Sequence, residues 1–446
     1  MGFFRQPGEL RRSSLSTKKK EKKSSIEQYR PISLTSVLGK VVEKAVGFQF
    51  GRWLESVLPN CMFGSRPGRG TADAIIQITD RIKGHLANGM KCMVVAKDAT
   101  AGFDLLPRSL IIRSLEVLGA GPKFVNWTKA YLEDRQSFVQ LGETTSDAWT
   151  VDTGVIQGGS NSAQFFNVGF MTQHLWVPEA ETTNFVDDGA SIVWAETAEE
   201  CQQKGEETAN RLAEWFQYAG LTLNAKKTEV VGFGFKPEPF LVGTQNIIPK
   251  SEVKFLGCLI CSSLKPDRQV DEVTSRVRSA AARIRLEGRN LGIKERRILY
   301  NAWALSQVCT NGACYLPLTN ASQLRRLQTA LNSAVRAVAG LPRKGNFPLT
   351  EVRKGLRLES VEMIRDRVLA MEAWKQNVGY KSVTDGPTTR AQKQLKIPVP
   401  DMRGWRGKCI GNLGKRMWNN LPSTIKTASD VKKARVLVKR WTQLNM

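Results

Sequence analysis

Residues 182–194 read Thr182-Thr-Asn-Phe-Val-Asp-Asp-Gly-Ala-Ser-Ile-Val-Trp194, two apolar runs on either side of Asp187, Asp188 and Gly189. Both runs are rich in strand-forming residues, and Asp-Gly is a common signal for the turn of a β-hairpin. The segment predicts two antiparallel strands around a tight acidic turn. An isolated Asp-Asp turn is usually only solvated, so its meaning depends on what surrounds it.

The surrounding pattern alternates between short strands and amphipathic helices from about residue 27 to residue 231. Cys92–Ala96 is a buried-strand run that ends just before Asp98, and Pro107 stands where a helix would begin. A capping box at Thr197-x-x-Glu200 predicts the start of a further helix. The resulting β-α-β-β-α-β order predicts an α+β fold with a split βαβ sheet and helices on one face.

Three carboxylates are expected at neighbouring strand ends of such a sheet: Asp98, Asp187 and Asp188. Phosphoryl transfer to a 3′-hydroxyl uses two divalent metal ions about 3.5–4 Å apart. Magnesium prefers hard oxygen ligands and keeps several waters, so two or three carboxylates suffice. We therefore expect these residues to bind two Mg²⁺ ions, for which Mn²⁺ can substitute.

Several motifs carry a resemblance to reverse transcriptases of non-LTR (LINE-type) retrotransposons, whose fold is a right-hand polymerase. The resembling segments, in chain order, are Tyr29-Arg-Pro-Ile-Ser-Leu34, Arg66-Pro-Gly-Arg-Gly-Thr71, Asp98-Ala-Thr-Ala-Gly-Phe-Asp104, Gly154-Val-Ile-Gln-Gly-Gly-Ser-Asn-Ser162, Phe185-Val-Asp-Asp188, Gly220-Leu-Thr-Leu-Asn-Ala-Lys-Lys-Thr228 and Lys254-Phe-Leu-Gly257. They cover about residues 27–260 in the order found in that family.

The resemblance implies a role for each candidate site residue. Asp98 and Asp187 would bridge the metals, with Asp188 assisting. The ring of Phe103 would lie under the sugar and select deoxynucleotides, or else it packs in the core.

The resemblance further implies contacts with the incoming nucleotide and the template. Gln157 and Gly158 would approach the nucleotide, and Lys227 would protonate the leaving pyrophosphate or stabilise its charge, unless it is simply a solvated lysine. Arg66 and Arg69 are candidates for phosphate or template contact.

Four positions depart from the family pattern without removing a carboxylate. Gly102 replaces the usual alanine, Ile156 the usual proline, and Ser65 a common aromatic residue. Lys97 directly precedes Asp98, and strand alternation should turn it away from the metals.

Charge and composition indicate the partners. Lys and Arg number 66 against 41 acids, a net charge of +25, which favours a polyanion such as nucleic acid. We expect binding of an RNA template, a DNA primer, their hybrid and deoxynucleotide triphosphates. No apolar run is long enough to span a membrane, and nuclear and/or cytoplasmic localisation is expected.

The sequence divides into four regions. We expect a basic, disordered tail over residues 1–24, fingers and palm over 25–250, a palm–thumb hairpin and helical thumb over 251–345, and a small basic helical region over 346–446. Gly386-Pro387 and Pro398-Val-Pro400 indicate a linker. The single Cys258-x-x-Cys261 pair has no matching partner pair, so buried free thiols are the expectation.

These features predict an RNA-directed DNA polymerase. With only His85 and His174, no histidine-dependent endonuclease can be assembled, so an endonuclease would be supplied in trans, and the chain has the character of a truncated polyprotein fragment. Two alternatives stay open: a catalytically inactive remnant that binds RNA or hybrid, and an RNA-dependent RNA polymerase.

Overall fold

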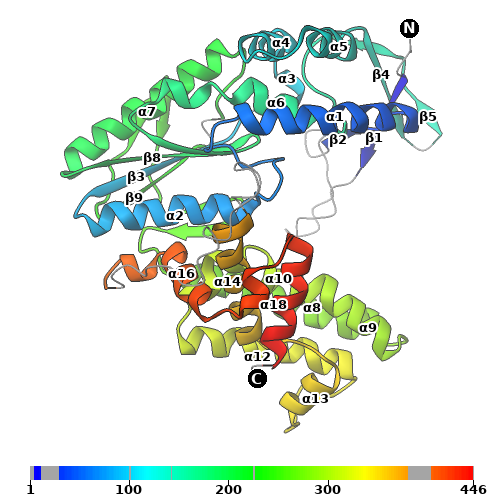
Figure 1. The fold of residues 1–446 in the computed structure, drawn as a ribbon, viewed down its shortest axis with the longest axis vertical. Helices are drawn as coiled ribbons and strands as arrows, with labels where there is room; N and C mark the ends of the chain where they lie inside the picture. The colour runs from blue at the N-terminus through cyan, green and yellow to red at the C-terminus, as the bar shows by residue number, and fades with distance from the viewer. Residues whose placement is uncertain are drawn as a thin grey trace.

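A part rich in sheets and a helical part make up the molecule (Figure 1). The computed structural model describes residues 5–11, 30–99, 102–141, 143–224, 227–379 and 403–444. The strands lie between residues 5 and 261, and the described residues after 261 form a helical half. The predicted α+β class is therefore confirmed.

The central sheet has four strands in the order β7-β8-β3-β9, and every neighbouring pair is antiparallel. Along the chain these elements are β3 (Lys91–Lys97), α6 (Ser162–Phe170), β7 (Glu181–Phe185), β8 (Asp188–Ala195), α7 (Ala198–Tyr218) and β9 (Glu229–Phe233). This is the predicted β-α-β-β-α-β order of a split βαβ sheet. The side chain of Thr197 caps α7 by accepting a hydrogen bond from the Glu200 amide, as the capping box predicts.

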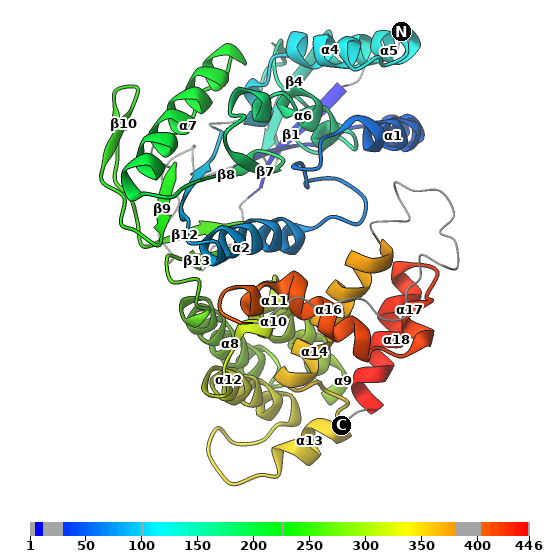
Figure 2. The ribbon, with the colours of Figure 1, turned by 60° about the vertical axis from the view of Figure 1, so that its left-hand side comes forward.

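Helices cover both faces of this sheet, not one as predicted. Met93 and Val95 of β3 belong to the core under α7, whereas Val94 and Ala96 belong to the core shared with α2 (Thr71–Ala87). Both views place the sheet between these two helices (Figures 1 and 2). Because the run Cys92–Ala96 of β3 is apolar on both sides, each side has to be buried.

The acidic hairpin turns two positions earlier than the Asp188-Gly189 signal predicts. Phe185 pairs with Asp188, so the two-residue turn is Val186–Asp187. Val186 has a φ of +60°, which is unusual for a β-branched residue. Gly189 lies within β8, where a Cβ would come within 2.4 Å of the Lys97 Cε atom. Its missing side chain therefore makes room for a buried lysine.

A second sheet has five strands. Its strands are β1 (Arg5–Arg11), β2 (Arg30–Ser33), β4 (Arg135–Leu141), β5 (Thr144–Thr145) and β6 (Trp149–Val151). β1 pairs in parallel with β4 and antiparallel with β2. Within residues 1–24, for which the sequence predicts disorder, the structure describes residues 5–11 as strand β1, paired through its backbone. The rest of that tail lies outside the described residues.

Further helices and two hairpins complete the part of the chain before residue 262. They are α1 (Val37–Val57), α3 (Gly102–Leu105), α4 (Arg108–Val117), α5 (Pro122–Leu132), η2 (Gln173–Trp176), the hairpin β10 (Phe240–Val242) and β11 (Gln245–Ile247), and the hairpin β12 (Glu252–Phe255) and β13 (Cys258–Cys261). Pro107 is the N-cap of α4, as expected. The β12–β13 turn uses Leu256 and Gly257, both with positive φ, at the hairpin that the Lys254-Phe-Leu-Gly257 motif implies.

The helical half follows the β12–β13 hairpin. Its elements are α8 (Asp267–Glu287), α9 (Ile293–Leu299), η3 (Tyr300–Leu305), α10 (Ser306–Cys309), α11 (Gly312–Tyr315), η4 (Leu316–Leu318), α12 (Ala321–Ala339), α13 (Leu349–Gly355), α14 (Val361–Trp374), η5 (Lys375–Gly379), η7 (Arg406–Lys408), α16 (Ile410–Asn420), α17 (Ser423–Lys426) and α18 (Val431–Leu444). Asn320 caps α12, and Gly340 ends it in the left-handed conformation. Val361 and Ile364 of α14 join the core of α8 and α12.

The last helices return to α2 through a polar seam. The carboxylate of Asp80 accepts hydrogen bonds from the amides of Ile410 (2.8 Å) and Gly411 (2.7 Å) at the start of α16. The ammonium of Lys83, 1% exposed, donates to the Lys408 carbonyl at 2.7 Å. Burial raises the pKa of Asp80 and lowers that of Lys83. The expected linker over residues 386–400 lies outside the described residues.

Among the described residues, no helix combines the length and apolar character that crossing a membrane would require.

Candidate active site

Two neighbouring strands bring the predicted acidic residues to one edge of the central sheet. Asp98 directly follows Lys97, the last residue of β3, which pairs with Gly189 of β8. Asp188 precedes Gly189 and begins β8, and Asp187 lies in the turn before it. The hairpin and the end of β3 therefore bring these three residues to the same edge of the sheet.

Lys227 reaches this edge from a separate segment. Its ammonium lies 2.6 Å from Asp98 Oδ2, and 60% of the lysine side chain is exposed against 19% for the aspartate. The backbone holds the segment in place, because the Asn224 amide donates to the Asp98 carbonyl at 3.0 Å and the Lys227 amide donates to the Asn224 carbonyl at 2.9 Å. The lysine is thus close enough to act on a charge that develops beside Asp98.

The donor chemistry of this edge suits divalent cations. Carboxylate oxygens from two adjacent strand ends are the hard ligands that Mg²⁺ prefers. Asp98 already holds a cationic group, the Lys227 ammonium, on an exposed stem that can move aside. Within the described ranges, no three or more His, Cys, Asp and Glu side chains are grouped so as to hold a metal ion. Metal binding by Asp98, Asp187 and Asp188 therefore stays a prediction.

Phe103 lies beside this edge on the short helix α3. Its ring is half-buried and stacks on Phe166 of α6, with the ring centroids 4.8 Å apart and the planes 17° from parallel. Gly102 brings the two elements together, since a Cβ there would be 3.1 Å from the Phe166 ring. The alternative of core packing thus accounts for one face of the Phe103 ring, and its contact with a sugar remains a prediction.

The loop of residues 154–162 starts against this helix. The Val155 amide donates to the Phe103 carbonyl at 2.8 Å. Gly154 has a φ of +74°, and a Cβ there would lie 2.4 Å from the Asp104 carbonyl oxygen, so only glycine fits. Arg135, 6% exposed, donates to the carbonyls of residues 153 and 154 at 3.0 and 2.7 Å. A buried guanidinium therefore fixes where the loop begins.

Gln157 and Gly158 occupy the middle of the same loop. The Gln157 carbonyl accepts a hydrogen bond from the Ser33 amide at 2.8 Å, which ties the loop to β2. Gly158 is exposed and has a φ of +119°, a conformation that glycine adopts readily. Both residues lie on the loop that begins beside Phe103. The resemblance implies that this loop contacts a nucleotide.

Arg66 is not available for the predicted phosphate or template contact. Its side chain is buried and forms a two-pronged ion pair with Glu55, at 3.0 and 2.9 Å. It also donates to the carbonyls of Pro59 and Met62 at 2.8 and 3.1 Å. The prediction for Arg66 is corrected, because a planar guanidinium can fold a loop around itself as readily as it can bind phosphate.

Arg69 is half-buried and stays a candidate for phosphate contact. Its guanidinium donates to the backbone and side-chain oxygens of Asn60, both at 3.0 Å, and lies 5.5 Å from the centre of the Phe63 ring.

Lys97 forms a buried polar site that the sequence does not reveal. Its side chain is 4% exposed and donates a short hydrogen bond to Oε1 of the fully buried Gln173. Burial lowers the pKa of Lys97 to about 7. This contact directs the Lys97 side chain into the core, and its orientation relative to the metals stays a prediction.

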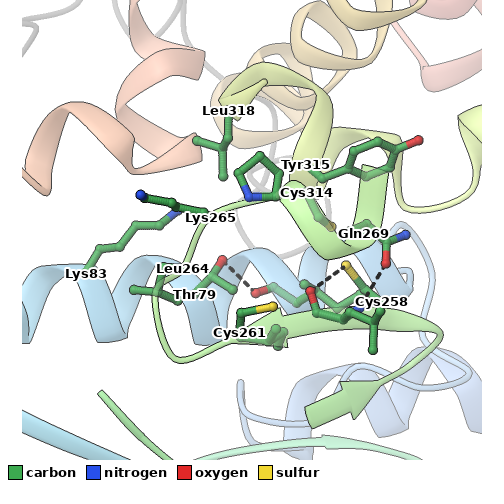
Figure 3. A pocket seen from close by; sticks show the side chains of 14 residues that line it. Thr79, Lys83, Cys258, Cys261, Leu264, Lys265, Gln269, Cys314, Tyr315 and Leu318 are labelled. Atoms are coloured by element: carbon green, nitrogen blue, oxygen red, sulfur yellow. Dashed lines mark hydrogen bonds between the residues drawn. The ribbon is translucent and has the colours of Figure 1, made fainter. Parts of the chain in front are cut away.

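The Cys258-x-x-Cys261 pair lines a small cleft between α2, β13, α8 and α11 (Figure 3). Cys314 and Lys83 also line it, and none of the predicted site residues does. Burial raises the pKa of Cys258 to about 12 and that of Cys261 to about 11, so both thiols are expected to be unreactive near neutral pH. The cysteines of the described residues are free, as predicted.

Comparison with known proteins identifies the family. The model for the family described as "Reverse transcriptase (RNA-dependent DNA polymerase)" matches residues 18–260. That range contains all seven resembling motifs. The chain therefore belongs to the reverse transcriptase family, and the resemblance stated from its motifs is confirmed.

Curated relatives come from transposons. The chain is 25% identical over 357 residues to a probable RNA-directed DNA polymerase from transposon BS of Drosophila melanogaster, covering 76% of this chain and 39% of the relative. It is 23% identical over 312 residues to an uncharacterized 149 kDa protein of transposon TX1 of Xenopus laevis, covering 66% of this chain and 23% of the relative. The chain thus spans well under half the length of these relatives.

Among solved structures, an apo telomerase from Candida tropicalis is similar, with a TM-score of 0.41 and 13% identity over 78% of this chain and 65% of that one. A telomerase from Candida albicans in complex with a fragment of telomeric RNA has a TM-score of 0.37 and 11% identity over 88% of this chain and 65% of that one.

Proposed function

We propose that this chain is an RNA-directed DNA polymerase that adds deoxynucleotides to the 3′-hydroxyl of a primer. The observation that carries the proposal is the juxtaposition at the sheet edge, where Lys227 contacts Asp98 and the Asp187–Asp188 turn lies on the adjacent strand. Membership of the reverse transcriptase family gives this constellation its reaction class.

Asp98, Asp187 and Asp188 would hold two Mg²⁺ ions, or Mn²⁺ in their place. When bound, these ions activate the attacking hydroxyl and neutralise the leaving pyrophosphate. The primer oxygen forms a bond to the α-phosphorus of the triphosphate, the bond from that phosphorus to pyrophosphate breaks, and the hydroxyl proton passes to solvent. Lys227 stabilises the charge of the departing pyrophosphate, for which its exposed ammonium is placed beside Asp98.

The helical half would hold the nucleic acid. From residue 381 to the end there are fifteen Lys and Arg against three acids, a balance that favours contact with phosphates. In α18, Lys432, Lys433 and Arg435 are exposed. We propose that this surface contacts template RNA or hybrid through phosphates and 2′-hydroxyls, with little sequence reading.

The proposal assigns no DNA cleavage to these 446 residues, since two separate histidines support no histidine-dependent nuclease. An endonuclease would act in trans, and the place of action would be the nucleus and/or the cytoplasm.

Primer extension on an RNA template with Mg²⁺ tests the proposal. Deoxynucleotides and ribonucleotides are supplied separately to the wild type, to an Asp187→Ala, Asp188→Ala variant and to a matched control, Asp147→Ala, which removes an exposed acid from a loop. We expect extension with deoxynucleotides only, lost in the double variant and kept in the control.

Other outcomes of this assay point to the alternatives. A folded wild type that binds hybrid but does not extend it is the inactive remnant. Extension with ribonucleotides in place of deoxynucleotides identifies an RNA-dependent RNA polymerase.

A further inference from the structure

A buried carboxylate outside the family motifs holds the far end of the loop 154–162. Glu43, on α1, is 1% exposed. Its Oε2 accepts a hydrogen bond from the Ser160 amide at 2.6 Å, and its Oε1 accepts one from the Tyr131 hydroxyl at 3.0 Å. Both carboxylate oxygens therefore have a donor, and one donor belongs to the backbone of the loop. Hydrogen bonds to an ionised acceptor are roughly twice as strong as those between neutral groups.

The backbone of α1 approaches the same part of the loop. Asn161 donates from its side-chain amide to the Glu43 carbonyl at 2.9 Å. One turn later, a Cβ on Gly47 would lie only 2.1 Å from Asn161 Oδ1, so a glycine is needed for this approach. The helix and the end of the loop are thus fitted to each other at two successive turns.

These contacts fix the two ends of a short span, within which the Gly159 amide also donates to the Ile156 carbonyl at 3.0 Å. The Ser33 amide holds the Gln157 carbonyl at 2.8 Å, and Glu43 holds the Ser160 amide at 2.6 Å. Gly158 lies between them with a φ of +119°, and the span from Gln157 to Ser160 contains two glycines. Glycine has the greatest backbone freedom of any residue, so such a span keeps one conformation only if both ends are fixed.

We propose that Glu43 is a positioning residue for the incoming nucleotide, which it serves by anchoring the loop that carries Gln157 and Gly158. The proposal rests on the proposed function, because it assumes that this loop contacts a deoxynucleotide triphosphate. Glu43 itself touches no substrate in this scheme. It fixes the backbone that does, so its loss should weaken nucleotide binding more than binding of the primer–template.

The principal variant is Glu43→Gln, which keeps the size of the side chain but loses the charge and replaces one acceptor by a donor. We expect the KM for deoxynucleotide to rise about 10- to 100-fold, as loss of a hydrogen bond to a charged group implies. The Kd for primer–template should change less than about threefold. Tyr131→Phe is the matched control, since it removes the other donor and leaves the Ser160 bond, and it should raise the KM far less.

Hydrogen exchange of the Ser160 amide in the protein without nucleotide gives a readout that needs no catalysis. We expect faster exchange in Glu43→Gln and wild-type exchange in Tyr131→Phe. Glu43→Asp keeps the charge but withdraws it from the loop, so it should show the same direction of change if Glu43→Gln does not fold.

The outcomes separate this inference from the proposed function. If the wild type extends primers but the Glu43 variants keep the wild-type KM, or weaken nucleotide and primer–template equally, the positioning role is refuted and the polymerase stands. Unchanged exchange of Ser160 likewise refutes the anchor. If the folded wild type extends nothing, the proposed function fails and the nucleotide role fails with it, while exchange still reports whether Glu43 holds the loop.

Discussion

Replacing Lys97 by methionine should stabilise the fold near neutral pH and lose that advantage in alkali. Burial lowers the pKa of Lys97 from 10.5 to about 7. The unfolded chain therefore binds more protons than the native chain between these values, and the stability of the wild type must rise with pH across that window. At 1.36 kcal/mol per pH unit, this shift in pKa lowers the free energy of unfolding by about 5 kcal/mol at low pH.

By the same relation, burial of Lys97 lowers the free energy of unfolding of the wild type by about 4 kcal/mol at pH 7 and by about 1 kcal/mol at pH 10. Methionine has a similar length and no charge, so Lys97→Met removes this penalty. It also leaves Gln173 Oε1 without its donor, which costs about 1–3 kcal/mol at any pH. The net gain should be roughly 1–3 kcal/mol at pH 7 and should vanish or become a loss at pH 10.

Urea unfolding of wild type and Lys97→Met at pH 7, 8.5 and 10 measures this difference. Lys123→Met, at an exposed position of α5, is the control and should change stability by less than about 0.5 kcal/mol throughout. A difference between wild type and Lys97→Met that stays constant from pH 7 to pH 10 would refute the reasoning, because it would mean that Lys97 binds its proton equally in both states.

Two further substitutions test the start of the loop at Gly154 and the ion pair of Arg66 with Glu55. Gly154→Ala should destabilise the protein by more than about 2 kcal/mol, because its Cβ would collide with a backbone oxygen at a φ of +74°, whereas Gly68→Ala, at the same φ in open space, should cost only about 1 kcal/mol in thermal unfolding. Arg66→Met should lower the free energy of unfolding by about 3–5 kcal/mol, since it leaves the Glu55 carboxylate unpaired. The salt dependence of RNA affinity should stay unchanged. If the slope of that dependence falls by about one, Arg66 contacts a phosphate after all.

The order of strands and helices along the chain and the place of the acidic residues at the strand ends could be predicted from the sequence, because both depend on local patterns. The run Cys92–Ala96 is apolar on both sides, and the hairpin 182–194 has strand-forming residues on either side of its turn. The position of the turn could not be predicted, because Asp-Gly favours a turn at Asp188–Gly189. The buried Lys97 side chain needs Gly189 inside β8, and the observed turn is Val186–Asp187.

The supports of the site could not be predicted, because they join residues far apart in the chain. Glu43 and Ser160 are separated by 117 positions, and no spacing rule connects a helical glutamate to the amide of a distant loop. The partner of Arg66 could not be predicted either, because Glu55, although only 11 positions away, lies on a different element. A charged residue in a motif indicates that charge is needed there, but its partner is decided by tertiary packing.

The polar seam between α2 and α16 has a consequence for how the chain is made. Asp80 receives its partner at Ile410 from 330 positions further along. A ribosome adds about 5–20 residues per second, so the gap corresponds to roughly 16–66 s of synthesis. Throughout that interval the flank of α2 with Asp80 and the later-buried Lys83 has to remain in water, and the finished sheet carries a charged, incomplete face. The last helices therefore close a surface that was synthesised 330 positions earlier.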